Sequence, residues 1–177
     1  MIVIGIDPGK TIGLCLYNGA AKAALDAYQI AHSDTQMEQV LDVIASWRSL
    51  HAVEAIAIEW PRIYQKAGND VADTIAQCGM FWWALGGRQL PVAHTPMWSK
   101  KHSAWMYAIA RSTVCAGLSA HMGQLVRSDG GVWAALVDLH GGRGVADLRK
   151  AGPFACLTGK THARSALAVA WAASFGG

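Results

Sequence analysis

Two acidic residues stand directly after apolar runs, at positions where β-strands are expected to end. Residues 2–6 form one such run and Asp7 follows it; residues 53–58 form another, and Glu59 follows it shortly before Pro61, which stops the strand. If a helical crossover joins the two strands into a parallel pair, their carboxyl ends lie side by side, about 4.8 Å apart. Two carboxylates at that separation can share a divalent cation.

Phosphodiester hydrolysis is the chemistry that such a pair supports. One metal ion activates water, a second stabilises the leaving oxygen, and acidic side chains hold the two ions about 3.5–4 Å apart. Ligand sites also collect at the carboxyl ends of parallel strands. The matched placement of Asp7 and Glu59 therefore favours a metal pair. The alternative is that Asp7 is a turn residue and Glu59 a solvated strand end.

The elements that must position this pair begin with three strands joined by hairpins. These strands are predicted for residues 2–6, 12–17 and 24–30. Asn18 and Gly19 form a strong hairpin turn signal after the second. Apolar residues then recur at helical spacing over residues 37–45, and Ser33 with Gln36 predicts a capping box in front of this helix.

Alternating helix and strand follow. After the strand that precedes Glu59, a helix is expected from Asn69 or Asp70 to about residue 85, ended by Gly86 and its following glycine, and then a short strand over residues 91–95. This order predicts an α/β fold with a five-stranded mixed sheet of the RNase H type, flanked by helices.

The length of 177 residues predicts a single domain spanning residues 1–177, without linker or repeat. With 53% hydrophobic and 15% charged residues, disorder is excluded. Residues 103–118 and 161–174 are expected to be helical, the second helix with Thr161 as N-cap. Residues 130–144 are ambiguous, and the sequence pattern does not assign helices or strands to residues 119–158.

Several classes of protein are excluded by composition. No apolar stretch reaches the roughly 18–20 residues of a membrane span, and Asp7 stands where an export signal would have its apolar stretch, so we expect a cytoplasmic protein without membrane contact. The cysteines show no CxxC spacing, which argues against a zinc site or a disulfide framework and favours free thiols. They are Cys15, Cys78, Cys115 and Cys156.

Short motifs in this order resemble the RuvC-type Holliday-junction resolvases. Residues 4–9 (IGIDPG), followed by Gly13, are similar to the opening of that family, and residues 56–61 (IAIEWP) are similar to its fourth strand, whose Glu is a metal ligand. Weaker similarity, in part to phage and prophage members, extends over residues 64–70, 95–101 and 162–170. The resemblance covers residues 1–101 and 160–174 and leaves the segment between them unmatched.

The resemblance implies a Mg²⁺-dependent endonuclease, in which Mn²⁺ can substitute, that cleaves branched DNA such as four-way junctions as a homodimer. The family places Asp-x-x-Asp on its last helix, whereas this chain has His162 and Ser165, on one helical face by their i, i+3 spacing. His162 would complete the site of Asp7 and Glu59, and Ser165 would be a weaker ligand, so metal binding should be weak. Any of the three later acids could supply a missing carboxylate: Asp129, Asp138 and Asp147.

Charge is divided unevenly along the chain. Residues 1–85 hold five Lys/Arg against nine Asp/Glu, a balance of −4, and residues 86–177 hold ten against three, a balance of +7. This suits a protein that binds cations in one place and phosphates in another, although a solvated surface is the alternative. The candidate DNA-binding residues, with Trp98 stacking on unpaired bases, are Lys66, Trp98, Lys100, Lys101 and Arg164.

Residues 80–83 (MFWW) cover most of a helix circumference, which predicts burial on more than one side, either in a dimer or under residues 119–158. Two other functions fit parts of this sequence. A relative with a decayed active site would bind branched DNA without cleaving it. The DPGKT segment at residues 7–11 also resembles the phosphate loop of actin-like ATPases, but those enzymes need two such domains.

Overall fold

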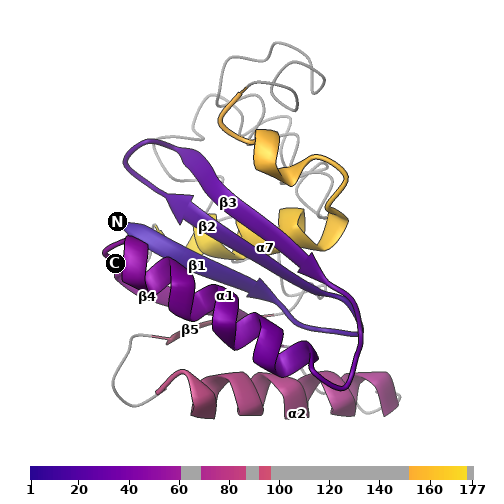
Figure 1. Ribbon diagram of the computed structural model, residues 1–177. Helices are drawn as coiled ribbons and strands as arrows, with labels where there is room; N and C mark the ends of the chain where they lie inside the picture. Colours follow the sequence, from indigo (N-terminus) through magenta and orange to yellow (C-terminus); the bar gives the residue numbers. More distant parts are fainter. Residues whose placement is uncertain (61–68, 87–91, 97–151, 175–177) are drawn as a thin grey trace, which may run out of the picture.

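A computed structural model describes residues 1–60, 69–86, 92–96 and 152–174. Within these ranges, the chain forms a mixed β-sheet with helices on both faces (Figure 1). The α/β order predicted from the sequence is confirmed. The expected helix over residues 103–118 and the ambiguous stretch 130–144 lie outside the described residues.

The sheet has the strand order β3-β2-β1-β4-β5. Its strands are β1 (Ile2–Asp7), β2 (Ile12–Asn18), β3 (Ala23–Ile30), β4 (Ala55–Trp60) and β5 (Val92–Pro96). The β1–β2 and β2–β3 pairs are antiparallel, whereas β1–β4 and β4–β5 are parallel. The first three strands therefore form a meander, and the crossover through a helix makes β1 and β4 parallel neighbours, as expected.

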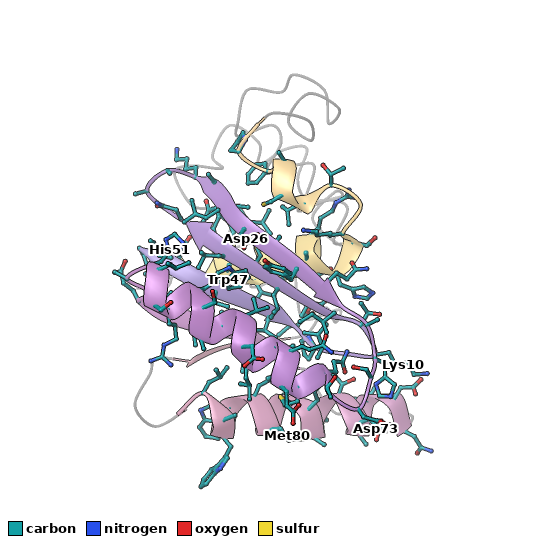
Figure 2. All side chains as sticks on the ribbon, viewed as in Figure 1. Lys10, Asp26, Trp47, His51, Asp73 and Met80 are labelled. Atoms are coloured by element: carbon teal, nitrogen blue, oxygen red, sulfur yellow. The ribbon has the colours of Figure 1, made fainter. Side chains whose placement is uncertain are left out.

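Helices α1 (Gln36–Leu50) and α2 (Asn69–Ala84) cover one face of the sheet, and the short 3₁₀ helix η3 (Ala155–Leu157) and α7 (Thr161–Ala173) cover the other (Figure 1). Side chains of a strand alternate between faces, so each strand feeds two apolar clusters. In β1, Ile4 and Ile6 pack under α1 and α2, while Val3 packs under α7. A polar contact joins the first cluster to the meander, because Trp47 Nε1 donates to Asp26 Oδ2 at 2.9 Å (Figure 2).

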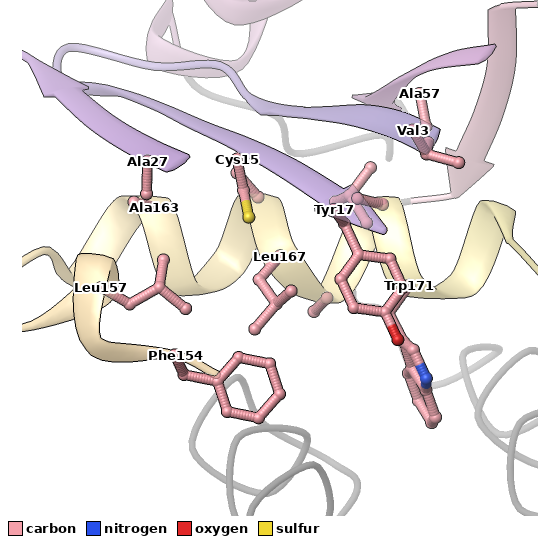
Figure 3. Packing of buried hydrophobic residues seen from close by; sticks show 14 residues of the cluster. Val3, Cys15, Tyr17, Ala27, Ala57, Phe154, Leu157, Ala163, Leu167 and Trp171 are labelled. Carbon is pink, nitrogen blue, oxygen red and sulfur yellow. The ribbon is translucent and has the colours of Figure 1, made fainter. Parts of the chain in front are cut away.

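The α7 face is packed unusually tightly, because two glycines let the helix rest on the strand backbones. A Cβ on Gly5 would overlap the carbonyl of Ala166 and lie 2.9 Å from Ala170 Cβ. On Gly13 it would overlap the carbonyl of His162 and lie 2.7 Å from Ala163 N. Around these contacts lie the buried residues of the α7 cluster, of which Figure 3 labels Val3, Cys15, Tyr17, Ala27, Ala57, Phe154, Leu157, Ala163, Leu167 and Trp171.

The outer edge of β3 is covered by the segment that leads into α7. The backbone N–H of Ala24 donates to Pro153 O at 2.9 Å, and Cys156 Sγ donates to Ala24 O at 3.5 Å. Farther along the strand, Lys160 Nζ donates to Ala27 O at 2.5 Å. These contacts use backbone groups that an uncovered edge strand would offer to another chain.

Two predicted helix caps are wrong. The N-cap of α1 is Thr35, whose side chain makes no cap bond. The side-chain amide of Gln36 donates to Lys10 O at 2.9 Å and to Ile30 O at 3.0 Å rather than serving the helix start. The capping box of Ser33 and Gln36 is therefore absent. Thr161 is the first residue of α7 rather than its N-cap, since the acceptor for the helix start comes from a neighbouring strand, as described below.

Helix α2 is buried on one side only in this single chain. Phe81 is fully buried, whereas Met80 is 55% and Trp83 is 86% exposed. Figure 2 shows Met80 on the side of α2 that faces away from the sheet. Burial on more than one side, predicted for residues 80–83, is therefore not found within the described part of the chain. The helix ends at Ala84, and Gly86, predicted to end it, follows two residues later with a φ of +74° that suits glycine. Across the described ranges, the structure has no helix with the length and apolarity that crossing a membrane requires.

Candidate active site

Strand register aligns one residue from each strand in a single row at the end of the sheet. Asp7 pairs with Gly13, and Gly13 pairs with Gln29. On the parallel side, Ile6 pairs with Ile58, and Asp7 and Glu59 are the residues that directly follow this last pair. In strand order, the row is Gln29, Gly13, Asp7, Glu59 and Thr95. The two acids identified from the sequence therefore stand on neighbouring strands at the same level, as predicted.

Alternation along the strands places both acids on the α7 face. Ile6 and Ile58 belong to the cluster under α1 and α2, so Asp7 and Glu59, one residue later, point to the opposite face. Glu59 is only 7% exposed, and the side chain of Asp7 is 15% exposed. Carboxylates withdrawn from water to this extent require compensating polar or cationic partners.

His162 contacts Asp7 from the first turn of α7. Its Nδ1 lies 3.0 Å from Asp7 Oδ2, and its side chain is 47% exposed. Because a carboxylate only accepts, Nδ1 donates in this bond, and in the neutral ring the lone pair is then on Nε2. A bond between residues 155 positions apart in the sequence thus joins the two ends of the described chain at one site.

The loop that follows Asp7 is held by a side chain from α2. The N–H of Gly9 donates to Gln77 Oε1 at 2.7 Å, and Gln77 Nε2 donates to Gly9 O at 3.4 Å. Gly9 has a φ of +154°, within the region that favours glycine. Together with the bond from Gln36 to Lys10, this contact fixes the backbone on both sides of the turn.

A protonated thiol from α2 lies against the backbone of Glu59, on the face of the sheet opposite to the two carboxylates. Cys78 is fully buried and its Sγ donates to Glu59 O at 3.5 Å. Burial raises the pKa of Cys78 to about 12, and the negative charges of Glu59 and Asp7 contribute to the rise, against a smaller lowering by the backbone hydrogen bond. The thiol is therefore neutral at ordinary pH, so it acts neither as a nucleophile nor as a thiolate ligand. Cys15, Cys78 and Cys156 are free, as expected.

The side chains at this site are of the chemical type that binds a hard cation, but they are few. Asp7 and Glu59 supply carboxylate oxygens, the ligands that Mg²⁺ prefers. Among the described residues, no three His, Cys, Asp or Glu side chains are grouped as a metal-binding cluster. Ser165 lies one turn after His162 and is 5% exposed. Oxygen donors are thus concentrated on two neighbouring strands, with an imidazole beside one of them.

The predicted site residues fall into two groups. Asp7 and His162 are in contact and Glu59 lies on the neighbouring strand, with Ser165 and the half-buried Arg164 following on α7. The other DNA-binding candidates and possible extra acids lie outside the described residues: Lys66, Trp98, Lys100, Lys101, Asp129, Asp138 and Asp147. Sequence reasoning missed the supporting roles of Gln29 and Gln77. An isolated glycine inside a strand signals close backbone approach, and Gly13 carried that signal.

The meander followed by parallel strands, with Asp7 at the end of β1, Glu59 next to the end of β4 and α7 across that face, is a fold similar to that of RuvC structures. The structure of Thermus thermophilus RuvC matches at 15% identity with a TM-score of 0.61, over 99% of this chain and 94% of RuvC. The structure of T. thermophilus RuvC in complex with Holliday junction substrate matches at 15% identity with a TM-score of 0.59, over 99% and 93%.

No family model and no curated protein sequence matches the chain. The structural matches establish the fold, so the resemblance to RuvC-type resolvases inferred from short motifs is confirmed at that level.

Proposed function

We propose that this protein is a metal-dependent, structure-specific endonuclease that hydrolyses phosphodiester bonds in branched DNA such as four-way junctions. The observation that supports this most directly is the placement of Asp7 and Glu59 at one level of β1 and β4, on the face where His162 approaches Asp7 to 3.0 Å. One of the matched structures, T. thermophilus RuvC, is bound to a Holliday junction substrate.

Asp7 and Glu59 would hold Mg²⁺, or Mn²⁺ in its place, and the metal would supply Lewis-acid activation of water and stabilisation of the leaving oxygen. The ring of His162, with Nδ1 donating to Asp7, presents Nε2 as the atom that accepts a proton from attacking water. Ser165 would add a neutral oxygen one turn later. The burial of Glu59 limits competing hydration of its carboxylate.

DNA would reach this site along the basic second half of the chain. We assign phosphate contacts to Lys66, Lys100, Lys101 and Arg164, and base stacking to Trp98. Affinity for a four-way junction should then fall steeply with salt, and K100A with K101A should flatten that slope.

A homodimer would match the two-fold symmetry of a four-way junction. Met80 and Trp83 on α2 offer exposed apolar area for such an interface. Sedimentation of the wild type and of W83A tests this: a wild-type monomer, or an unchanged W83A dimer, would remove α2 from the interface.

A second candidate is a branched-DNA-binding protein with a weakened active site. It is favoured by one observation: within the described ranges, no third His, Cys, Asp or Glu joins the two acids as a metal cluster, and Ser165 stands where the resemblance implies a carboxylate. Such a protein would bind a four-way junction more tightly than duplex DNA without cutting it.

Cleavage of a labelled four-way junction in Mg²⁺ or Mn²⁺ distinguishes these functions. D7N and E59Q keep side-chain size but remove metal-binding charge, so cleavage should fall more than about 100-fold while junction binding persists. D42N is the matched control, because Asp42 is an exposed acid on α1. Full cleavage by either site variant would refute the assigned ligands, and binding without cleavage by the wild type would establish the second candidate.

A further inference from the structure

The first turn of α7 is anchored to the row of residues that holds the acids. The N–H of His162 donates to Gln29 Oε1 at 3.1 Å, while the His162 imidazole bonds to Asp7. Gln29 and Asp7 lie on either side of Gly13 in the same row. His162 is therefore held twice, through its backbone by β3 and through its ring by β1.

Gly13 explains why both bonds form at once. Lacking a Cβ, it lets the carbonyl of His162 and the N of Ala163 rest directly on β2. The helix start thus lies over Gly13, within reach of the Gln29 side chain on one flank and the Asp7 side chain on the other. An acceptor on the N–H of an early helical residue is also what a helix N-terminus requires, and Thr161 does not supply it in this structure.

We infer that Gln29 is a positioning residue for the active site. Its side-chain oxygen caps α7 and fixes the backbone of His162, so that Nδ1 faces Asp7 and Nε2 faces the reacting groups. This inference rests on the proposed function for its catalytic consequence, but the geometry it asserts can be measured without activity. Gln29 is exposed, so its loss leaves no hole in either apolar cluster.

The alternative is that Gln29 merely stabilises the fold. The variants Q29M and Q29E distinguish the positioning role from a purely stabilising one. Q29M keeps the length of the side chain and removes the acceptor, whereas Q29E keeps an acceptor and adds negative charge beside a helix N-terminus, where it is favourable. Q39M is the matched control, because Gln39 is an exposed glutamine on α1 that bonds only locally to Thr35.

The experiment is NMR of the unliganded protein, with ¹⁵N shifts of the His162 ring and hydrogen exchange of the His162 amide, followed by junction cleavage. In Q29M we expect amide exchange to accelerate about fivefold, as losing a typical cap allows, and the Nδ1–H tautomer signal to weaken. We expect Q29E and Q39M to match the wild type in the exchange rate of the His162 amide and in the tautomer signal of its ring. The turnover number for cleavage should fall about tenfold or more in Q29M, with junction affinity unchanged.

Two results would overturn the inference. One is a Q29M protein whose His162 ring and amide signals are those of the wild type. The other is a Q29E protein whose His162 signals differ from those of the wild type as much as those of Q29M do, because the acceptor would then be irrelevant. If Q29M fails to fold, altered His162 signals in Q29E alone overturn the inference. If the wild type has the expected His162 signals but cleaves no junction, the proposed function fails while the positioning role of Gln29 stands.

Discussion

Replacing Gly13 with alanine should disturb the active site through the helix that lies on it. The new Cβ would lie 2.7 Å from Ala163 N and would overlap the His162 carbonyl. Ordinary van der Waals contact begins near 3.4 Å, so Ala163 N alone requires a shift of 0.7 Å, and the closer carbonyl of His162 requires the first turn of α7 to move farther. That shift is large for a hydrogen bond of 3.0 Å between His162 and Asp7, and it is directed away from the sheet.

The expected cost has two parts. Overpacking of a tight backbone contact destabilises a fold by about 1–3 kcal/mol. A displacement approaching 1 Å at a catalytic group can lower the rate by about 100-fold. Urea unfolding of G13A measures the first, and single-turnover cleavage of a four-way junction measures the second.

Gly79 provides the control for the same chemical change. It lies inside α2, and a Cβ there would meet nothing within 4 Å. G79A should therefore be neutral or stabilising by up to about 1 kcal/mol, because alanine favours the helix. A G13A protein as stable as the wild type, with unchanged cleavage, would refute the claim that α7 docks on the bare backbone of β2.

Two further outcomes follow from buried groups. Without divalent ions, S165D should lower the free energy of unfolding by about 1–3 kcal/mol, because Ser165 is only 5% exposed. Mg²⁺ should restore part of this stability in S165D and none in S165N. A loss that Mg²⁺ leaves unaltered would remove Ser165 from the site. Folding stability should fall as pH rises above 9, because the Cys78 thiol ionises there in the unfolded chain, while its pKa in the folded protein is about 12. Urea unfolding between pH 8 and 10 should show a shallower fall of stability in C78A. An identical dependence of stability on pH in C78A and the wild type would contradict the raised pKa.

The acids could be predicted from the sequence because each is marked by local pattern. An apolar run followed by Asp7, and another followed by Glu59, define strand ends, and the α/β order then fixes which ends are neighbours. Which described segments are strands and which are helices could be predicted for the same reason. Hydrophobic periodicity is local information, and the described elements follow it closely.

The supporting contacts could not be predicted, because they depend on register and on residues far apart in the chain. Gln29 reaches His162 across 133 positions, and nothing in the sequence around Gln29 distinguishes it from an ordinary polar residue on an exposed strand. Gln36 fitted a capping box locally, but its amide instead donates to the carbonyl of Lys10, in the turn after β1, and to that of Ile30, at the end of β3. Long-range geometry overrode a valid local signal in this case.

The cover over the β3 edge has a consequence for the protein during its synthesis. Pro153 and Lys160 satisfy backbone groups of Ala24 and Ala27, more than 120 residues earlier in the chain. At translation rates of about 5–20 residues per second, the meander waits several seconds or longer on the ribosome with this edge and its α7 face uncovered. A nascent chain is therefore prone to pairing with its neighbours and lacks His162 altogether. Docking of residues 152–173 therefore forms the contact between His162 and Asp7 and covers the edge of β3 at the same time.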